Sequence, residues 1–112
     1  MPSSGRHRRL ALNESRFREI NDRLAQELGK LRHQPPHFDF VCECSHLDCR
    51  EKVSLTAAEY EHLRADPMLF AVADGHQVPD AEDVVARTDR FATVRKHADV
   101  EGIVRATDPR AP

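Results

Sequence analysis

All three cysteines of this chain lie within eight residues, in the segment CECSHLDC at positions 42–49. Chance would rarely place three cysteines so close together in 112 residues. Structural zinc sites prefer thiolate ligands, which bind at about 2.3 Å in a tetrahedral set of four. The spacing Cys-x-Cys-x4-Cys therefore predicts that Cys42, Cys44 and Cys49 converge on one metal ion, and zinc is the ion we expect.

The spacing does not fix the fourth ligand. His76 follows the Asp-Gly pair at 74–75, where a tight turn can bring it to the cysteines and join two parts of the chain. His46 lies inside the cysteine loop and gives a more crowded arrangement. We favour His76, with His46 as the alternative and with Asp48, water or another chain as further alternatives.

Two other interpretations of the cysteines are open. Cysteine is a small apolar residue that is often buried, so the three thiols can be inert parts of a core. Clustered thiolates can also be oxidised when they are exposed, and a thiol redox switch follows from that.

The residues around the cysteines predict a β-hairpin. The segment 38–44 alternates with a period of two and reads as a strand, residues 45–48 form a turn, and residues 50–55 read as a second strand. This pairing would gather the three sulfurs at one end of the hairpin, on its core side.

An amphipathic helix is predicted over residues 13–33, after a disordered basic arm at 1–12. Asn13 is its expected N-cap, and Gly29 and the two prolines at 35–36 end it. Its apolar residues recur at spacings of three and four and form one stripe: Phe17, Ile20, Leu24, Leu28 and Leu31. We expect the stripe to pack on its own domain. A homodimer through Phe17, Ile20, Leu24 and Leu28 is the alternative.

The remaining sequence, residues 38–106, predicts a small α+β domain, followed by a tail at 107–112. Thr56 and Glu59 form a capping box for a short helix with Tyr60 and Leu63 facing inward. A buried strand follows at 68–72, strands near 84–85 and 91–94 pair across a turn, and a weak helix covers 100–105. The expected fold class is α+β: a small antiparallel sheet with a long N-terminal helix and a short capped helix. Only 39% of the residues are apolar and none is Trp, so a metal is expected to help so small a core.

The net charge of −2 conceals two parts of opposite sign. Residues 1–33 hold eight Lys and Arg against four Asp and Glu, whereas the rest holds nine against fifteen. The arm at 6–9, with Arg16, Arg18 and Arg23, suggests a nucleic-acid-binding regulator as an alternative function. The acidic body and the lack of helix-turn-helix or zinc-finger spacing argue against it.

Nothing in the sequence predicts export or membrane insertion. There is no apolar run near eighteen residues, and no apolar segment follows the basic start. The odd number of cysteines favours reduced thiols in a cytoplasm.

No catalytic constellation stands out, so we do not expect an enzyme. A catalytic zinc needs an open position and a nearby general base. Strand alternation turns Glu43 away from the cysteines, and the acidic clusters at 59–61 and 80–83 read as solvated faces. The expected function is a zinc-stabilised regulatory or adaptor module that binds an unidentified protein.

One combined pattern resembles a group of short uncharacterised bacterial proteins, chiefly from actinobacteria. Its features here are Phe40 to Cys44, Cys49, Val53, Leu55, Thr56, Glu59, Tyr60, Arg64, Asp66, Pro67, Phe70, Gly75, His76 and Pro79. The resemblance spans roughly residues 16–108. It implies that the cysteines and the Gly-His turn belong to one pattern, which favours His76, and it implies a bacterial cytoplasm.

Overall fold

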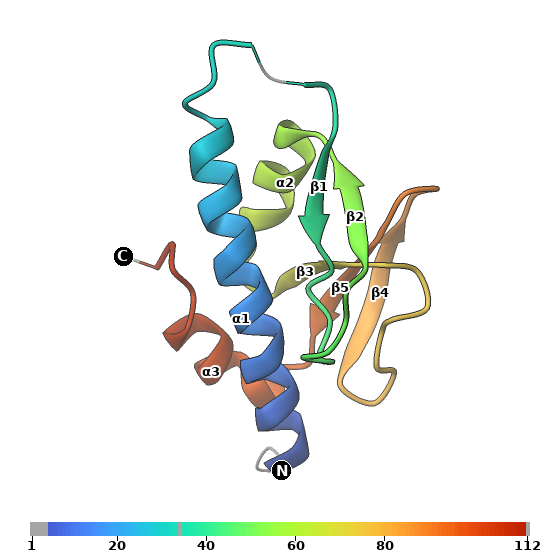
Figure 1. Cartoon of the computed structure of the whole chain (residues 1–112). Coiled ribbons are helices and arrows are strands. Elements are labelled where there is room, and N and C mark those ends of the chain that lie inside the picture. Colours follow the sequence, from blue (N-terminus) through green and yellow to red (C-terminus); the bar gives the residue numbers. More distant parts are fainter. Residues whose placement is uncertain (1–4, 34, 112) are drawn as a thin grey trace.

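A computed structural model describes residues 5–33 and 35–111 of the chain (Figure 1). Its elements are α1 (Gly5–Leu28), β1 (Phe38–Val41), β2 (Lys52–Leu55), α2 (Ala57–Arg64), β3 (Leu69–Val72), β4 (Glu82–Arg87), β5 (Ala92–Lys96), the 3₁₀ turn η1 (Ala98–Val100) and α3 (Glu101–Ala106). The predicted α+β class, with a long N-terminal helix and a short capped helix, is confirmed.

The strands form two antiparallel sheets rather than one. β1 and β2 make a hairpin in which Phe40 lies opposite Val53. β3, β5 and β4 make a second sheet in that order. The long helix α1 runs alongside β1 (Figure 1) and also contacts α2 and α3.

The local signals for α2 are confirmed in detail. The Thr56 hydroxyl accepts a hydrogen bond from the Glu59 amide at 3.0 Å, and the Glu59 carboxylate accepts one from the Thr56 amide at 2.8 Å. Tyr60 and Leu63 are buried. The helix ends at Arg64, shortly before Pro67, because proline disfavours helical conformation in the residue before it.

The helix α1 begins at Gly5, eight residues before the predicted start, so the prediction of a disordered arm is wrong for residues 5–12. Tertiary contacts explain the difference. Ala11 is completely buried, Arg6 pairs with Asp80, and His7 lies 2.8 Å from Asp99. Residues 1–4 of the predicted arm lie outside the described residues.

The predicted apolar stripe of α1 does not form its buried face, and this prediction is wrong. Ile20, Leu24 and Leu31 are 45%, 38% and 48% exposed, whereas Phe17 and Leu28 are half-buried. The buried residues of the helix are instead mostly polar: Ala11, Glu14, Ser15, Arg18, Asn21 and Asp22. Each charged group among them meets a partner in the body of the domain, which sequence periodicity does not report.

A buried ion triad holds the first half of α1 to the larger sheet. The Lys96 ammonium lies 2.7 Å from Glu14 and 3.1 Å from Glu82, and none of the three side chains is more than 1% exposed. Burial raises the pKa of Glu14, and the neighbouring Glu82 carboxylate raises it further. The prediction that Glu82 belongs to a solvated face is therefore wrong.

Further along α1, two more charged residues are buried. Arg18 lies over the ring of Phe70, 4.5 Å from its centroid, and donates hydrogen bonds to the carbonyls of Pro67 and Val104. Asp22 accepts two hydrogen bonds from Arg64, at 2.9 and 3.1 Å.

The chain after α3 is anchored to the same network. Asp108 pairs with Arg64, and Arg110 pairs with Asp22 at 3.0 Å and with Glu61 at 2.8 Å. Residues 107–111, the described part of the predicted tail, therefore pack against α1 and α2.

We expect Lys96→Met to destabilise the domain by about 3–5 kcal/mol, because the methionine leaves two buried carboxylates without a cation. Lys30→Met removes the exposed pair with Glu27 and should cost less than about 1 kcal/mol. Urea unfolding of both variants measures the difference. If Lys96→Met and Lys30→Met had equal free energies of unfolding, the buried triad would contribute no more to stability than an exposed ion pair.

Stability should also depend on Glu59 in acid. The Arg90 guanidinium, which binds this carboxylate at 2.7 and 2.9 Å, lowers the pKa of Glu59 from its ordinary 4.5 to about 2. A lowered pKa contributes stability that is fully present above pH 4.5 and is lost as the pH falls toward 2. We expect the stability difference between the parent chain and Glu59→Gln to shrink over that range. Unfolding curves at several pH values test this, and a constant difference would contradict it.

Candidate metal centre

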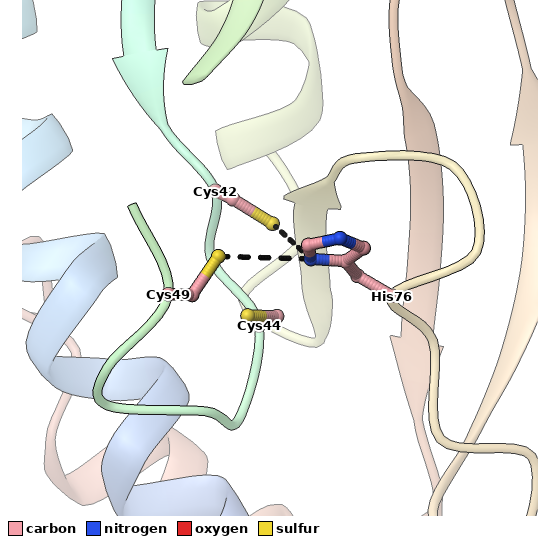
Figure 2. Close-up of side chains that lie close together, drawn as sticks. All are labelled: Cys42, Cys44, Cys49 and His76. Carbon is pink, nitrogen blue, oxygen red and sulfur yellow. Dashed lines mark hydrogen bonds between the residues drawn. The ribbon is translucent and has the colours of Figure 1, made fainter. Parts of the chain in front are cut away.

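Three separate segments bring four potential metal ligands together. Cys42 and Cys44 follow β1, Cys49 precedes β2, and His76 lies in the loop between β3 and β4. Figure 2 shows their side chains pointing toward a common centre. The four ligand atoms all lie within 4.8 Å of one another.

The distances fit a tetrahedral ion. Nδ1 of His76 is 3.6 Å from the sulfur of Cys42 and 3.6 Å from that of Cys49. In a regular zinc tetrahedron, with bonds of about 2.3 Å to sulfur and about 2.0–2.1 Å to nitrogen, a sulfur and a nitrogen lie about 3.6 Å apart. These two distances thus match those of a zinc site with sulfur and nitrogen ligands, and all four ligand atoms lie within 4.8 Å of one another.

The geometry around His76 also favours an ion over simple hydrogen bonding. A neutral imidazole nitrogen that accepts hydrogen bonds has one lone pair, yet Cys42 and Cys49 approach the same Nδ1 at equal distances. One ion placed among the four atoms would satisfy all of them at once.

Two tight turns place the ligands. Gly75 has a φ of +87°, a conformation that L side chains rarely adopt, and it directs the chain so that His76 turns back toward the hairpin. The amide of His76 donates to the carbonyl of Ala73 at 3.0 Å, and the amide of Cys49 donates to that of His46 at 3.0 Å. The Asp-Gly signal in the sequence is therefore confirmed as a turn.

In the absence of a metal, the pKa values of the three cysteine thiols are shifted in different directions. A hydrogen bond from the Cys42 thiol lowers the pKa of Cys44 to about 4, and the same bond, with burial, raises the pKa of Cys42. Burial raises the pKa of Cys49. Because metal ligation requires thiolates, binding a divalent cation would release the protons held by Cys42 and Cys49.

Backbone amides supply the surrounding polar support. The Ala73 amide donates to the Cys42 sulfur at 3.1 Å. Hydrogen bonds from the backbone of His46 and of Glu51 lower the pKa values of Cys44 and Cys49. The Ala73 amide thereby stabilises negative charge on the Cys42 sulfur, as a thiolate ligand requires. A Cys44 thiol donates to the His46 carbonyl oxygen, 4.0 Å away.

The alternative ligands lie elsewhere. His46 and Asp48 are exposed, and neither belongs to the cluster. Among residues 5–33 and 35–111, no other histidine, cysteine or carboxylate joins these four. Of the two candidate histidines, His76 is the one whose ring lies with the three cysteines.

Glu43 has a structural role that the sequence did not reveal. Its amide donates to the Ala71 carbonyl at 2.8 Å, and its carboxylate accepts from the Ala71 amide at 3.0 Å. The other carboxylate oxygen binds Asn21 and Tyr60. Strand alternation correctly predicted that Glu43 turns away from the cysteines, but its partners come from residues distant in sequence.

The basic residues expected to contact nucleic acid are mostly engaged. Arg18 is buried, and Arg6 and Arg23 pair with Asp80 and Glu19. Exposed arginines that form no ion pair within the described part of α1 are Arg8, Arg9 and Arg16. This leaves a small cationic area rather than the broad one that the sequence suggested.

No protein-family model, curated protein or solved structure matches the chain. None of the helices in the described ranges has the length and hydropathy needed to cross a membrane.

Elemental analysis of the purified chain should find about one zinc per molecule. Cys42→Ser and His76→Ala should each lower that content, because each removes one of four ligands and weakens binding. His46→Ala is the matched control and should retain the metal, since His46 lies outside the cluster. Metal loss in the His46 variant, or none in the parent, would contradict the assignment.

Proposed function

We propose that this chain is a small zinc-stabilised regulatory or adaptor module that acts by binding another protein. The observation that carries the proposal is the convergence of Cys42, Cys44, Cys49 and His76 between the two sheets. A metal at this position would connect the hairpin to the loop after β3. No strand pairing among the described residues joins these two parts of the chain.

The ligand set supports zinc in a structural role. Three thiolates and one imidazole are a common closed set for structural zinc, whereas catalytic zinc sites keep one position for water or substrate. Thiolates must be reduced to bind the metal, and a bacterial cytoplasm supplies that condition. A cytoplasmic location is part of the proposal.

A role other than catalysis is supported by the surroundings of the cluster. Glu43 is completely buried and bonded to Asn21, Tyr60 and Ala71. It is therefore held away from the metal position, where a general base would be needed.

Exposed apolar side chains support a protein-binding role. Leu12, Ile20, Leu24 and Leu31 of α1 and the following turn, and Leu47 of the cysteine loop, are each between 38% and 48% exposed. Large apolar side chains gathered along one element are typical of interaction surfaces. They are exposed here because α1 uses its polar face against the domain.

A second copy of the chain is the alternative partner, through the surface first identified by Phe17, Ile20, Leu24 and Leu28. Ile20 and Leu24 are available for it, but Phe17 and Leu28 are half-buried by their own domain. That surface is narrower than a continuous coiled-coil seam.

Removal of zinc with a chelator should unfold the domain, since metal-binding energy in a domain with so small a core is also folding energy. Circular dichroism and urea unfolding should show the loss, and added zinc, but not magnesium, should restore the fold. His46→Ala should behave like the parent chain. An unchanged spectrum after verified metal removal would contradict a structural role.

A further inference from the structure

The backbone of β1 alternates between two edges, and the pairing fixes which residues use which edge. The Cys42 amide donates to the Glu51 carbonyl at 3.1 Å, so Phe38, Phe40 and Cys42 direct their backbone groups toward β2 in the antiparallel register. The backbone groups of Asp39, Val41 and Glu43 consequently point to the outer edge.

The domain itself covers two of these three outer positions. The side chain of Asn21 both donates to the Val41 carbonyl, at 2.8 Å, and accepts from the Val41 amide, at 2.9 Å. The Glu43 amide donates to Ala71. The backbone groups of Asp39 have no hydrogen-bond partner in the part of the chain that the structure describes.

An apolar groove lies beside this open position. It has a volume of about 300 Å³ and is lined by Leu24, Glu27, Leu28, Leu31, Phe38, Asp39 and Phe40. The lining joins the last turns of α1 to the beginning of β1, and Leu24 and Leu31 are 38% and 48% exposed. An unpaired strand edge next to apolar side chains is the arrangement that binds peptides by β-strand addition.

We propose that this groove binds an extended segment of a partner protein, which adds a short strand to the outer edge of β1 at Asp39. The inference rests on the proposed protein-binding function and assigns it a surface. The segment's backbone pairs with Asp39, and its neighbouring side chains enter the groove.

The alternation of side chains specifies what the segment contains. Phe40 is buried and Phe38 half-buried, whereas the Asp39 side chain is exposed and forms no ion pair among the described residues. A residue opposite Asp39 shares its exposed face, and opposite charges in such cross-strand pairs are favourable. The matching sequence is therefore apolar, basic, apolar.

The same charge argues against a second copy of the chain as the occupant. Two β1 strands paired about Asp39 would place two carboxylates directly opposite each other, which is destabilising. The edge thus favours a cationic partner segment over itself.

The test uses the zinc-loaded full chain and two blocked synthetic peptides that differ only in the centre, Thr-Val-Lys-Val-Thr and Thr-Val-Glu-Val-Thr. Amide shifts in nuclear magnetic resonance spectra locate binding and give the dissociation constants. The lysine peptide should shift the amides of residues 37–40 and bind several-fold more tightly than the glutamate peptide, as expected for one cross-strand charge pair. A third peptide with an N-methylated central lysine should bind more weakly, because it lacks the donor to Asp39.

Variants of the protein separate the charge from the groove. Asp39→Lys should reverse the preference between the two peptides. Leu31→Asp should weaken both by about tenfold, the effect expected for losing one buried leucine contact. Val85→Asp is the matched control, because Val85 is 49% exposed, close to the 48% of Leu31, and lies outside the groove. It should leave both affinities unchanged.

The proposal is overturned if no peptide shifts residues 37–40 at concentrations up to about 1 mM, the weak end of specific affinities, or if Asp39→Lys leaves the preference unaltered. Selection from a random peptide display library separates this failure from that of the proposed function. Selected binders that shift the amides around Leu12 or Ile20 instead would retain a protein-binding module while rejecting this groove. Binders that shift residues 37–40 and carry the apolar-basic-apolar pattern would support the groove.

Discussion

Cys42 and Glu43 are adjacent in the sequence, point to opposite sides of one extended segment, and both hold the chain around β3. The sulfur of Cys42 accepts the Ala73 amide, and the carboxylate of Glu43 accepts the Ala71 amide. Since side chains alternate along a strand, one segment can serve a metal cluster on one side and a polar network on the other. The hairpin and the larger sheet are positioned by this junction, and α1 is positioned against it through Asn21.

The interior of the domain is unusually rich in charge for its size. Lys96 with its two glutamates, Arg64 with Asp22, and Arg18 over Phe70 occupy places where apolar side chains are common. Buried ion pairs offset their own desolvation but add little net stability, although breaking one is costly. They therefore fix how α1 docks while adding little net stability, so a metal held by the cysteine and histidine cluster would add to the folding free energy.

Because α1 packs on the domain through its polar face, its apolar face is the one exposed at the surface. Because the helix is held by Glu14, Arg18 and Asp22, it leaves Ile20, Leu24 and Leu31 at the surface. The groove beside Asp39 follows from the same helix orientation. The last turns of α1 extend beyond Asn21, whose side chain covers the outer edge of β1 at Val41 and leaves the edge at Asp39 open. The candidate metal centre and the proposed peptide groove therefore both depend on how α1 is held against the hairpin.

The sequence by itself determined the elements whose signals are local. The Cys-x-Cys-x4-Cys spacing and strand alternation predicted the hairpin that gathers the sulfurs, Thr56 and Glu59 predicted the start of α2, and Asp74-Gly75 predicted the turn that presents His76. Only the tertiary structure decided which face of α1 is buried and where that helix begins. Those outcomes depend on Lys96, Arg64 and Asp99, which lie more than forty residues away from their partners in α1. Hydrophobic periodicity measures the apolar character of a face and does not register charged partners that arrive from a distant part of the chain.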